Sequence, residues 1–370
     1  MAPTHFTRVG LKNFKGHANT QVPLSRFTLL VGANGTGKTS VLEAAALVCQ
    51  MPFAESESAF LASLDPELLL RSFPEGSMFT SETSDLAVSL EFGGGPVSLG
   101  LRLSRGAQQS ATFFVGTQKQ SIGELDSGHL PESIKAAKGV ALLRLDPRTI
   151  AAPSQSTVEF PVVGSDGSGL ATALKEIKAN KEARFDQFRS AVRAVVPAVE
   201  DFRFARRKRT ASRSRSIRVE DQVIDVPESY DVIEDELLVR FTGTGFVRAR
   251  AASEGTLITI ALLGLLYANE QPPRLILIDD LDRGLHIEAQ AELVKALRKV
   301  LELHPETQII ATGHSPYLAD HFEPSEVVVL RRPEPGAAIE ATRLSEHPDK
   351  VLREFKTGEA LVATGKDWFG

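Results

Sequence analysis

The chain of 370 residues contains a single cysteine, Cys49. One cysteine excludes an internal disulfide and any metal site built from several cysteines. A sequence so poor in cysteine is typical of a reducing compartment. Cys49 lies in an apolar stretch with helical spacing, so we expect it to pack in the core.

Long apolar runs are also missing. The longest covers residues 257–268, well short of the ~18 residues that suggest a membrane-spanning helix. The N-terminus lacks the basic segment and apolar core of a signal peptide. These two absences predict a cytoplasmic protein that does not bind a membrane.

A strong excess of one charge is absent as well. The formal net charge of −5 argues against a surface that binds nucleic acid over its whole extent, and leaves room for local basic patches. The composition, 42% hydrophobic and 24% charged, is that of a globular protein. No H-E-x-x-H motif and no G-x-S-x-G motif in a strand-to-helix setting occurs, so we assign any effector chemistry to another chain.

Residues 27–40 combine an apolar run, a glycine-rich turn and the start of an apolar helix. This is the strand, G-x-x-x-x-G-K-[ST] loop and helix of a P-loop. Lys38 suits the β- and γ-phosphates of a nucleotide and Thr39 suits Mg²⁺, whereas an ordinary glycine-rich turn leaves Lys38 unexplained. The predicted nucleotide-binding residues are Gly32, Asn34, Gly35, Gly37, Lys38, Thr39 and Ser40.

Period-two and helical patterns predict the surrounding elements. We expect strands at 6–11, 20–24, 85–92, 97–103, 111–115 and 140–145, a helix over 59–73, a loop or lid over 151–169, and two helices within 170–202 broken near Asn180. An amphipathic helix is expected after residue 286, with Ile287, Leu293 and Leu297 on its apolar stripe.

Two charged runs of opposite sign follow each other. Residues 203–218 hold eight Lys or Arg residues and no acid, and residues 220–236 hold eight Asp or Glu residues and no base. A nucleic-acid contact through Arg206, Arg207, Lys208 and Arg209 is one interpretation. A hairpin whose strands carry opposing charges is the other, and the adjacency of the two runs favours it.

Three further segments carry polar groups at element ends. Ser253 and Gly255 begin an apolar helix, whose exposed N–H groups suit a phosphate arriving from outside. The apolar segment 274–278 ends in Asp279 and Asp280, as in a Walker B strand that presents a Mg²⁺ ligand. The segment 308–311 leads to His314. A histidine after a core strand is more often structural, but the order of all these motifs along the chain favours one shared site.

This ordered set resembles the ABC-type ATPase heads of the Rad50, structural-maintenance-of-chromosomes (SMC) and RecF group. It more closely resembles the compact bacterial AAA-family ATPases related to overcoming-lysogenization-defect (OLD) nucleases, without the nuclease domain. The resemblance covers nearly the whole chain, and it rests on residues 11–14, 32–39, 167–170, 253–256, 279–280, 284–286 and 314–316.

The resemblance implies an α/β fold: an ABC-type P-loop NTPase head with a mixed sheet, flanking antiparallel strands and an inserted helical arm. Residues 1–165 would form lobe I, 166–250 the arm and charged hairpin, and 251–370 lobe II. Two copies would bind head to tail, with ATP between the P-loop of one and Ser253–Gly255 of the other.

The resemblance also implies individual roles and shows departures. Asp279 would hold Mg²⁺ through water, Asp280 would orient the attacking water, and His314 would contact the γ-phosphate. Residues 282–286 would form the D-loop. The family usually has Glu where this chain has Asp280, and Thr where it has Gly313. No glutamine is identified as that of the Q-loop, and Gln155 is a weak candidate.

Two functions therefore compete. The first is an ATPase that acts as the motor or switch subunit of a DNA-associated system, in phage defence or DNA repair, together with an effector protein. The second is an ATP-gated scaffold that hydrolyses little, and the short Asp280 side chain is the feature that separates the two. A transporter subunit is disfavoured by residues 11–14 and by the helical insertion.

Overall fold

The computed structural model describes residues 5–54, 86–92, 98–104, 110–115, 118–120, 139–155, 162–219, 222–268, 273–334 and 337–346. The contact pattern divides the chain into two units. Unit 1 comprises residues 1–143, 272–283 and 297–370, and unit 2 comprises 144–271 and 284–296. The segment predicted as a helix over 59–73 lies outside the described residues.

A mixed sheet forms the centre of unit 1, with strand order β15-β14-β3-β13-β12-β8. Five of its strands run parallel, and β15 pairs antiparallel with β14. Every residue of β3, β12 and β13 is buried, as expected of parallel strands covered on both faces. The strands are β3 (Phe27–Val31), β8 (Val140–Leu143), β12 (Leu275–Ile278), β13 (Gln308–Thr312), β14 (Val327–Arg331) and β15 (Glu340–Arg343).

A second, antiparallel sheet completes unit 1, with order β2-β1-β4-β5-β6-β7. Its strands are β1 (Phe6–Phe14), β2 (His17–Pro23), β4 (Leu86–Phe92), β5 (Ser98–Ser104), β6 (Ser110–Val115) and β7 (Gln118–Gln120). In β4 the burial alternates strictly, so one face packs inward. The hairpin and the antiparallel strands predicted on either side of the P-loop are confirmed.

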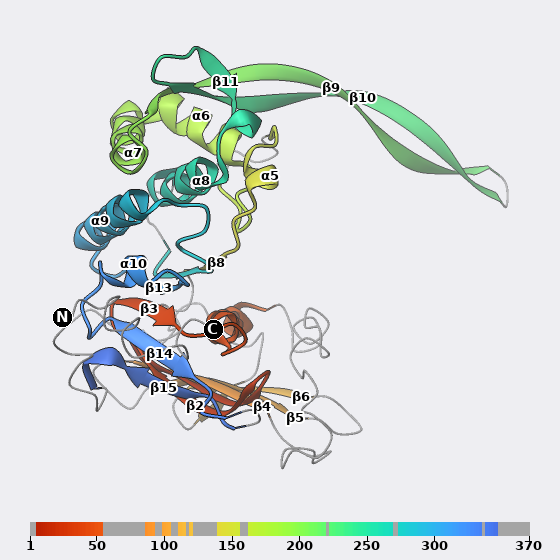
Figure 1. Ribbon diagram of the computed structural model, residues 1–370. Helices are drawn as coiled ribbons and strands as arrows, with labels where there is room; N and C mark the ends of the chain where they lie inside the picture. Colours follow the sequence, from red (N-terminus) through yellow and green to blue (C-terminus); the bar gives the residue numbers. More distant parts are fainter. Residues whose placement is uncertain are drawn as a thin grey trace. The chain divides into compact units, whose positions relative to one another are not determined.

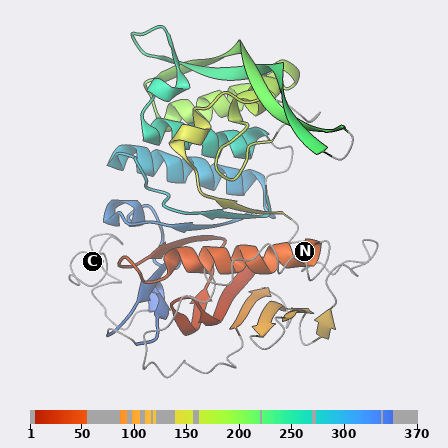
Figure 2. The same ribbon diagram turned by 90° about the vertical axis from the view of Figure 1, so that its right-hand side faces the viewer.

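Helix α1 (Lys38–Gln50) packs in the core of unit 1 (Figure 2). Its side chains share one apolar cluster with residues of the antiparallel sheet and with Leu277, Ile310 and Leu330 of the mixed sheet. Cys49 is fully buried in this helix, and burial raises the pKa of its thiol far above the usual value. The predicted packing role of Cys49 is confirmed.

Unit 2 contains α5 (Pro147–Ile150), α6 (Leu170–Asn180), α7 (Glu182–Val195) and α8 (Glu254–Ala268), together with β9 (Val199–Val219), β10 (Gln222–Phe241) and β11 (Phe246–Arg248). The rings of Phe185 and Phe188 pack on Phe202 of β9, with centroids 6.3 Å and 5.2 Å away. The two predicted helices are present, but the helical segment ends at Val195. Phe202 belongs to a strand, from which it reaches this aromatic cluster.

Strands β9 and β10 form a long antiparallel hairpin whose far end extends beyond the helices of unit 2 (Figure 1). Helix α9 (Ile287–Leu303) belongs to both units, and α10 is Pro316–Ala319. Leu293 and Leu297 of α9 are buried as predicted, whereas Ile287, which begins the helix, is 50% exposed. No helix in the described ranges is long and apolar enough to cross a membrane.

Candidate nucleotide site

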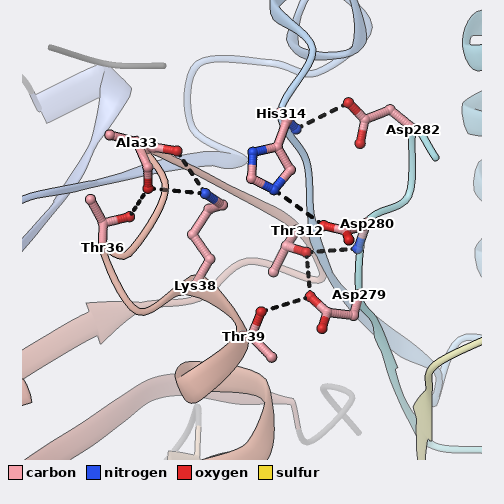
Figure 3. A network of polar contacts seen from close by, with 10 residues as sticks. Ala33, Thr36, Lys38, Thr39, Asp279, Asp280, Asp282, Thr312 and His314 are labelled. Atoms are coloured by element: carbon pink, nitrogen blue, oxygen red, sulfur yellow. Dashed lines mark hydrogen bonds and ion pairs between the residues drawn. The ribbon is translucent and has the colours of Figure 1, made fainter. Parts of the chain in front are cut away.

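Three neighbouring parallel strands of unit 1 end at the candidate site. Strand β3 leads into the P-loop, β12 leads to Asp279 and Asp280, and β13 ends at Thr312, two residues before His314. The carboxyl ends of parallel strands meet at one edge of a sheet. Figure 3 shows the side chains of these segments turned toward one another.

The P-loop lysine is held by the loop itself. Its Nζ donates to the carbonyl oxygens of Gly32 and Ala33, at 2.7 Å and 3.2 Å (Figure 3). Burial lowers the pKa of Lys38, and the nearby carboxylates of Asp280, Asp279 and Asp282 oppose this shift. The ammonium group thus lies between the loop and a cluster of acids, where a phosphate group would find a cation already in place.

The predicted metal ligands are adjacent. The Thr39 hydroxyl donates to Oδ1 of Asp279 at 3.0 Å. Mg²⁺ in nucleotide sites is bound through one or two carboxylates, a hydroxyl and the substrate phosphates. This pair of oxygen ligands fits Mg²⁺.

Thr312 connects the two acids, a role that sequence reasoning missed. Its hydroxyl donates to Oδ1 of Asp279 at 2.8 Å, and it accepts the backbone N–H of Asp280 at 2.8 Å (Figure 3). Thr312 is fully buried at the end of β13. The sequence offered one signal for this role, a residue with a hydroxyl group directly after the apolar segment 308–311.

Asp280 and His314 are paired. Nε2 of His314 lies 3.2 Å from Oδ1 of Asp280, and both side chains are nearly half exposed. The backbone N–H of His314 donates to Oδ2 of Asp282 at 3.0 Å. Asp280 has φ of 54°, a left-handed conformation that Asp and Asn adopt more readily than other non-glycine residues. The carboxylate and the imidazole therefore face solvent together beside Lys38 and Asp279.

The remaining P-loop residues are placed as follows. Gly35 and Gly37 both have φ of 81°, Asn34 is exposed, and Ser40 is partly buried in the first turn of α1. Gln155, the Q-loop candidate, is exposed and stays a prediction.

The predicted signature lies in unit 2 at the start of α8. The Ser253 hydroxyl accepts the Thr256 N–H at 3.3 Å, which is the expected helix cap. A side chain at Gly255 is excluded, because its Cβ would lie 2.1 Å from the carbonyl oxygen of Gly284. Glycine at both positions thus allows the signature and the D-loop to pack backbone to backbone within unit 2.

The charged runs form the β9–β10 hairpin. Lys208 pairs with Asp231 at 2.7 Å and Arg209 pairs with Glu234 at 2.8 Å. Each of these basic side chains therefore has an acidic partner across the hairpin, as the charge-pairing interpretation predicted. Arg206 and Arg207 are exposed, and neither has an ion pair within the described part of the chain.

A P-loop, an acidic strand end and a following histidine on one mixed sheet define an ATPase head. The chain belongs to the family described as "AAA domain, putative AbiEii toxin, Type IV TA system", whose model matches residues 27–320. No curated protein matches the sequence significantly.

Solved structures of SMC head domains have a similar fold. The SMC head bound to the C-winged helix domain of ScpA is 16% identical with a TM-score of 0.55, over 91% of this chain and 97% of that one. The SMC head from Pyrococcus furiosus with an extended coiled coil, bound to the C-terminal domain of ScpA, is 15% identical with a TM-score of 0.56, over 95% and 99%. The head with a coiled coil and joint from Pyrococcus yayanosii is 11% identical with a TM-score of 0.55, over 98% and 100%. The predicted fold class, an ABC-type ATPase head, is confirmed.

Proposed function

We propose that two copies of this chain bind two ATP molecules head to tail and hydrolyse them to ADP and phosphate. The observation that supports this most strongly is the convergence of Lys38, Thr39, Asp279, Asp280 and His314 at one edge of the mixed sheet. These groups supply a phosphate cation, two metal ligands and a pair of proton-handling groups. Catalysis of phosphoryl transfer consists mainly of such positioning and charge stabilisation.

Each residue has a defined task in this proposal. The backbone N–H groups of the P-loop and Lys38 bind the β- and γ-phosphates. Thr39 and Asp279 would hold Mg²⁺, which when bound neutralises phosphate charge. Asp280 orients the attacking water and accepts its proton as the water oxygen bonds to the γ-phosphorus. The bond between the γ-phosphorus and the oxygen that bridges it to the β-phosphorus breaks, and ADP leaves. His314 donates a hydrogen bond to the γ-phosphate, and Thr312 keeps Asp279 and the backbone of Asp280 in place.

The signature would complete the site of a second copy. Ser253 is exposed at the start of α8, where its hydroxyl contacts the hydroxyl of Thr256 at 2.9 Å, so a γ-phosphate that reaches this helix end would replace Thr256 as the partner of the Ser253 hydroxyl. Since Gly255 packs on Gly284, closure of the dimer would move the signature and the D-loop together. ATP binding then favours the closed dimer and hydrolysis favours its opening.

The biological role follows as a further part of the proposal. We assign the chain to a DNA-associated system of phage defence or DNA repair, in which it is the motor or switch subunit and an effector protein is its partner. Two of the similar SMC heads are bound to a domain of ScpA, and the family description names a putative toxin. Both support a head that acts with another protein. The competing function is a scaffold that binds ATP and hydrolyses little, and it rests on the short side chain of Asp280.

Ser253→Arg tests the dimer. The larger, positively charged side chain should block closure at the signature while ATP binding by the monomer stays intact, so ATP should no longer raise the mass measured by light scattering. Ser190→Arg is the matched control, because it adds the same charge to an exposed position of α7 in the same unit. An ATP-dependent dimer that persists in Ser253→Arg would refute the sandwich.

A DNA contact through Arg206, Arg207, Lys208 and Arg209 is a second candidate, and the ion pairs of the hairpin favour the first two of these residues. Asp235, directly opposite Arg206, pairs with Lys175 at 2.7 Å, and Glu234, opposite Arg207, pairs with Arg209. Among the described residues no acid pairs with either arginine, so we take both as available to an outside anion. Replacing both by Ala should weaken duplex DNA binding at low salt and reduce the slope of log K against log salt by about two units.

The matched control for the hairpin is the double variant Lys208→Ala and Arg209→Ala, which removes the same charge from side chains that already have acidic partners. It should change DNA affinity less. Equal effects of the two double variants would show that the charge alone matters, and a wild-type protein without measurable DNA affinity at low salt would remove this candidate.

A further inference from the structure

A buried histidine lies directly against the phosphate loop. His17 begins β2 and is fully buried. Its Nε2 is 3.2 Å from the carbonyl oxygen of Gly37, and its Nδ1 is 3.0 Å from the hydroxyl oxygen of Thr20. The residue comes from the antiparallel sheet, whereas Gly37 immediately precedes the P-loop lysine. None of the tasks assigned above uses His17.

The contact with Gly37 requires a proton on one particular nitrogen of His17. Burial lowers the pKa of the imidazole to about 4, with Arg332 adding to the shift and the Gly37 carbonyl opposing it. The ring is therefore neutral near pH 7 and has one N–H. A carbonyl oxygen can only accept a hydrogen bond, so the contact with Gly37 requires the proton on Nε2, while the Thr20 hydroxyl beside Nδ1 donates to the carbonyl oxygen of Ile339 at 2.9 Å.

Gly37 is the residue at which the loop becomes a helix. It has φ of 81° and is the N-cap of α1, without a side-chain hydrogen bond to the first turn. Its carbonyl oxygen also accepts the N–H of Val41 at 3.1 Å, the first bond of the helix. A Cβ at position 37 would lie 2.3 Å from Nε2 of His17, so the imidazole occupies the space beside the Gly37 peptide.

We propose that His17 is a positioning residue of the phosphate loop, which fixes the Gly37 carbonyl and so directs the following N–H groups of Lys38 and Thr39 toward the phosphates of a nucleotide. The contact acts before and during phosphoryl transfer alike, because the phosphates stay in the loop throughout. Loss of the donor should therefore weaken ATP binding and leave kcat nearly unchanged. This inference rests on the proposed ATPase function.

The test compares three variants of His17 in the full chain. His17→Leu fills the cavity without a donor, His17→Gln returns an N–H near the position of Nε2, and His17→Asn returns one near Nδ1 only. ATP affinity is measured by equilibrium titration, and kcat and KM by phosphate release. We expect the Kd and KM of His17→Leu to rise about 5- to 10-fold, the size of one neutral hydrogen bond. His17→Gln should recover most of this loss and His17→Asn should not.

Stability is followed in parallel by thermal unfolding without nucleotide. If the Kd follows the unfolding temperature across all three variants, or if His17→Leu binds ATP like the wild type, the positioning role is wrong. If His17→Leu does not fold, the difference in Kd between His17→Gln and His17→Asn still tests the positioning role, since only glutamine is expected to donate to Gly37. A wild-type protein that does not bind ATP would instead refute the proposed function.

Discussion

Replacing Lys38 by methionine should reduce ATP affinity about 100-fold or more and abolish ATP-dependent dimerisation. Hydrogen bonds to charged groups each contribute ~1.5–3 kcal/mol, and Lys38 is placed to make them to two phosphates. Methionine preserves much of the apolar stem, so the variant removes the charge with little change in packing. Lys38→Ala should have the same effect on binding, with an additional loss of packing. A calorimetric titration of each variant with ATP measures the effect.

Lys12→Ala is the control for Lys38. Lys12 is an exposed lysine of β1 in the same unit, so its removal changes the charge of unit 1 equally without touching the loop. Its ATP affinity should equal that of the wild type. Unchanged ATP affinity in Lys38→Met would refute the assignment of residues 32–39 as the phosphate loop.

The parts of the site that the sequence predicted are those that depend on local pattern. The loop from Gly32 to Thr39 is specified within eight consecutive residues. Asp279 and His314 follow buried apolar strands, and parallel strands end at one edge of a sheet. Their proximity could therefore be inferred without knowing the order of strands.

The parts that were missed depend on contacts between distant segments. Thr312 acts because β13 pairs with β12 in a register that aligns Ala311 with Ile278, which leaves Thr312 beside the two acids. His17 touches Gly37 only because β2 packs beside the P-loop, and no local pattern indicates that contact. The left-handed backbone at Asp280 was equally invisible, since nothing in the neighbouring residues requires it.

The ion pairs of the hairpin also depend on contacts that no local sequence pattern reveals. Adjacent runs of opposite charge predicted that the strands pair, and they do. The observed ion pairs are diagonal, however: Lys208 lies directly opposite Ile233 but pairs with Asp231. The register and Lys175 of α6 determine which acids of the described residues are already paired, and neither could be derived from the charge runs alone.

The Asp280 variants should give the second large effect. Asp280→Asn keeps the size of the side chain and suits a left-handed backbone, so only the negative charge is lost. Without the charge the residue cannot accept a proton from water, and general base catalysis typically contributes 10²–10⁴-fold. We therefore expect hydrolysis to fall at least about 100-fold, while ATP binding stays intact and the closed dimer accumulates. Steady-state phosphate release and light scattering with ATP measure the two effects.

Asp280→Glu decides how the short side chain is accommodated. Two hypotheses stand: the carboxylate falls short of the water and limits turnover, or the local backbone has moved to compensate. The φ of 54° at Asp280 and the contact of its carboxylate with His314 at 3.2 Å favour the second, because glutamate adopts a left-handed backbone less readily and its longer side chain would overfill the space beside the imidazole. We expect Asp280→Glu to lower the rate of phosphate release. A higher rate would establish instead that the short reach of Asp280 makes the wild-type enzyme slow, and an unchanged rate in Asp280→Asn would show that Asp280 is not catalytic.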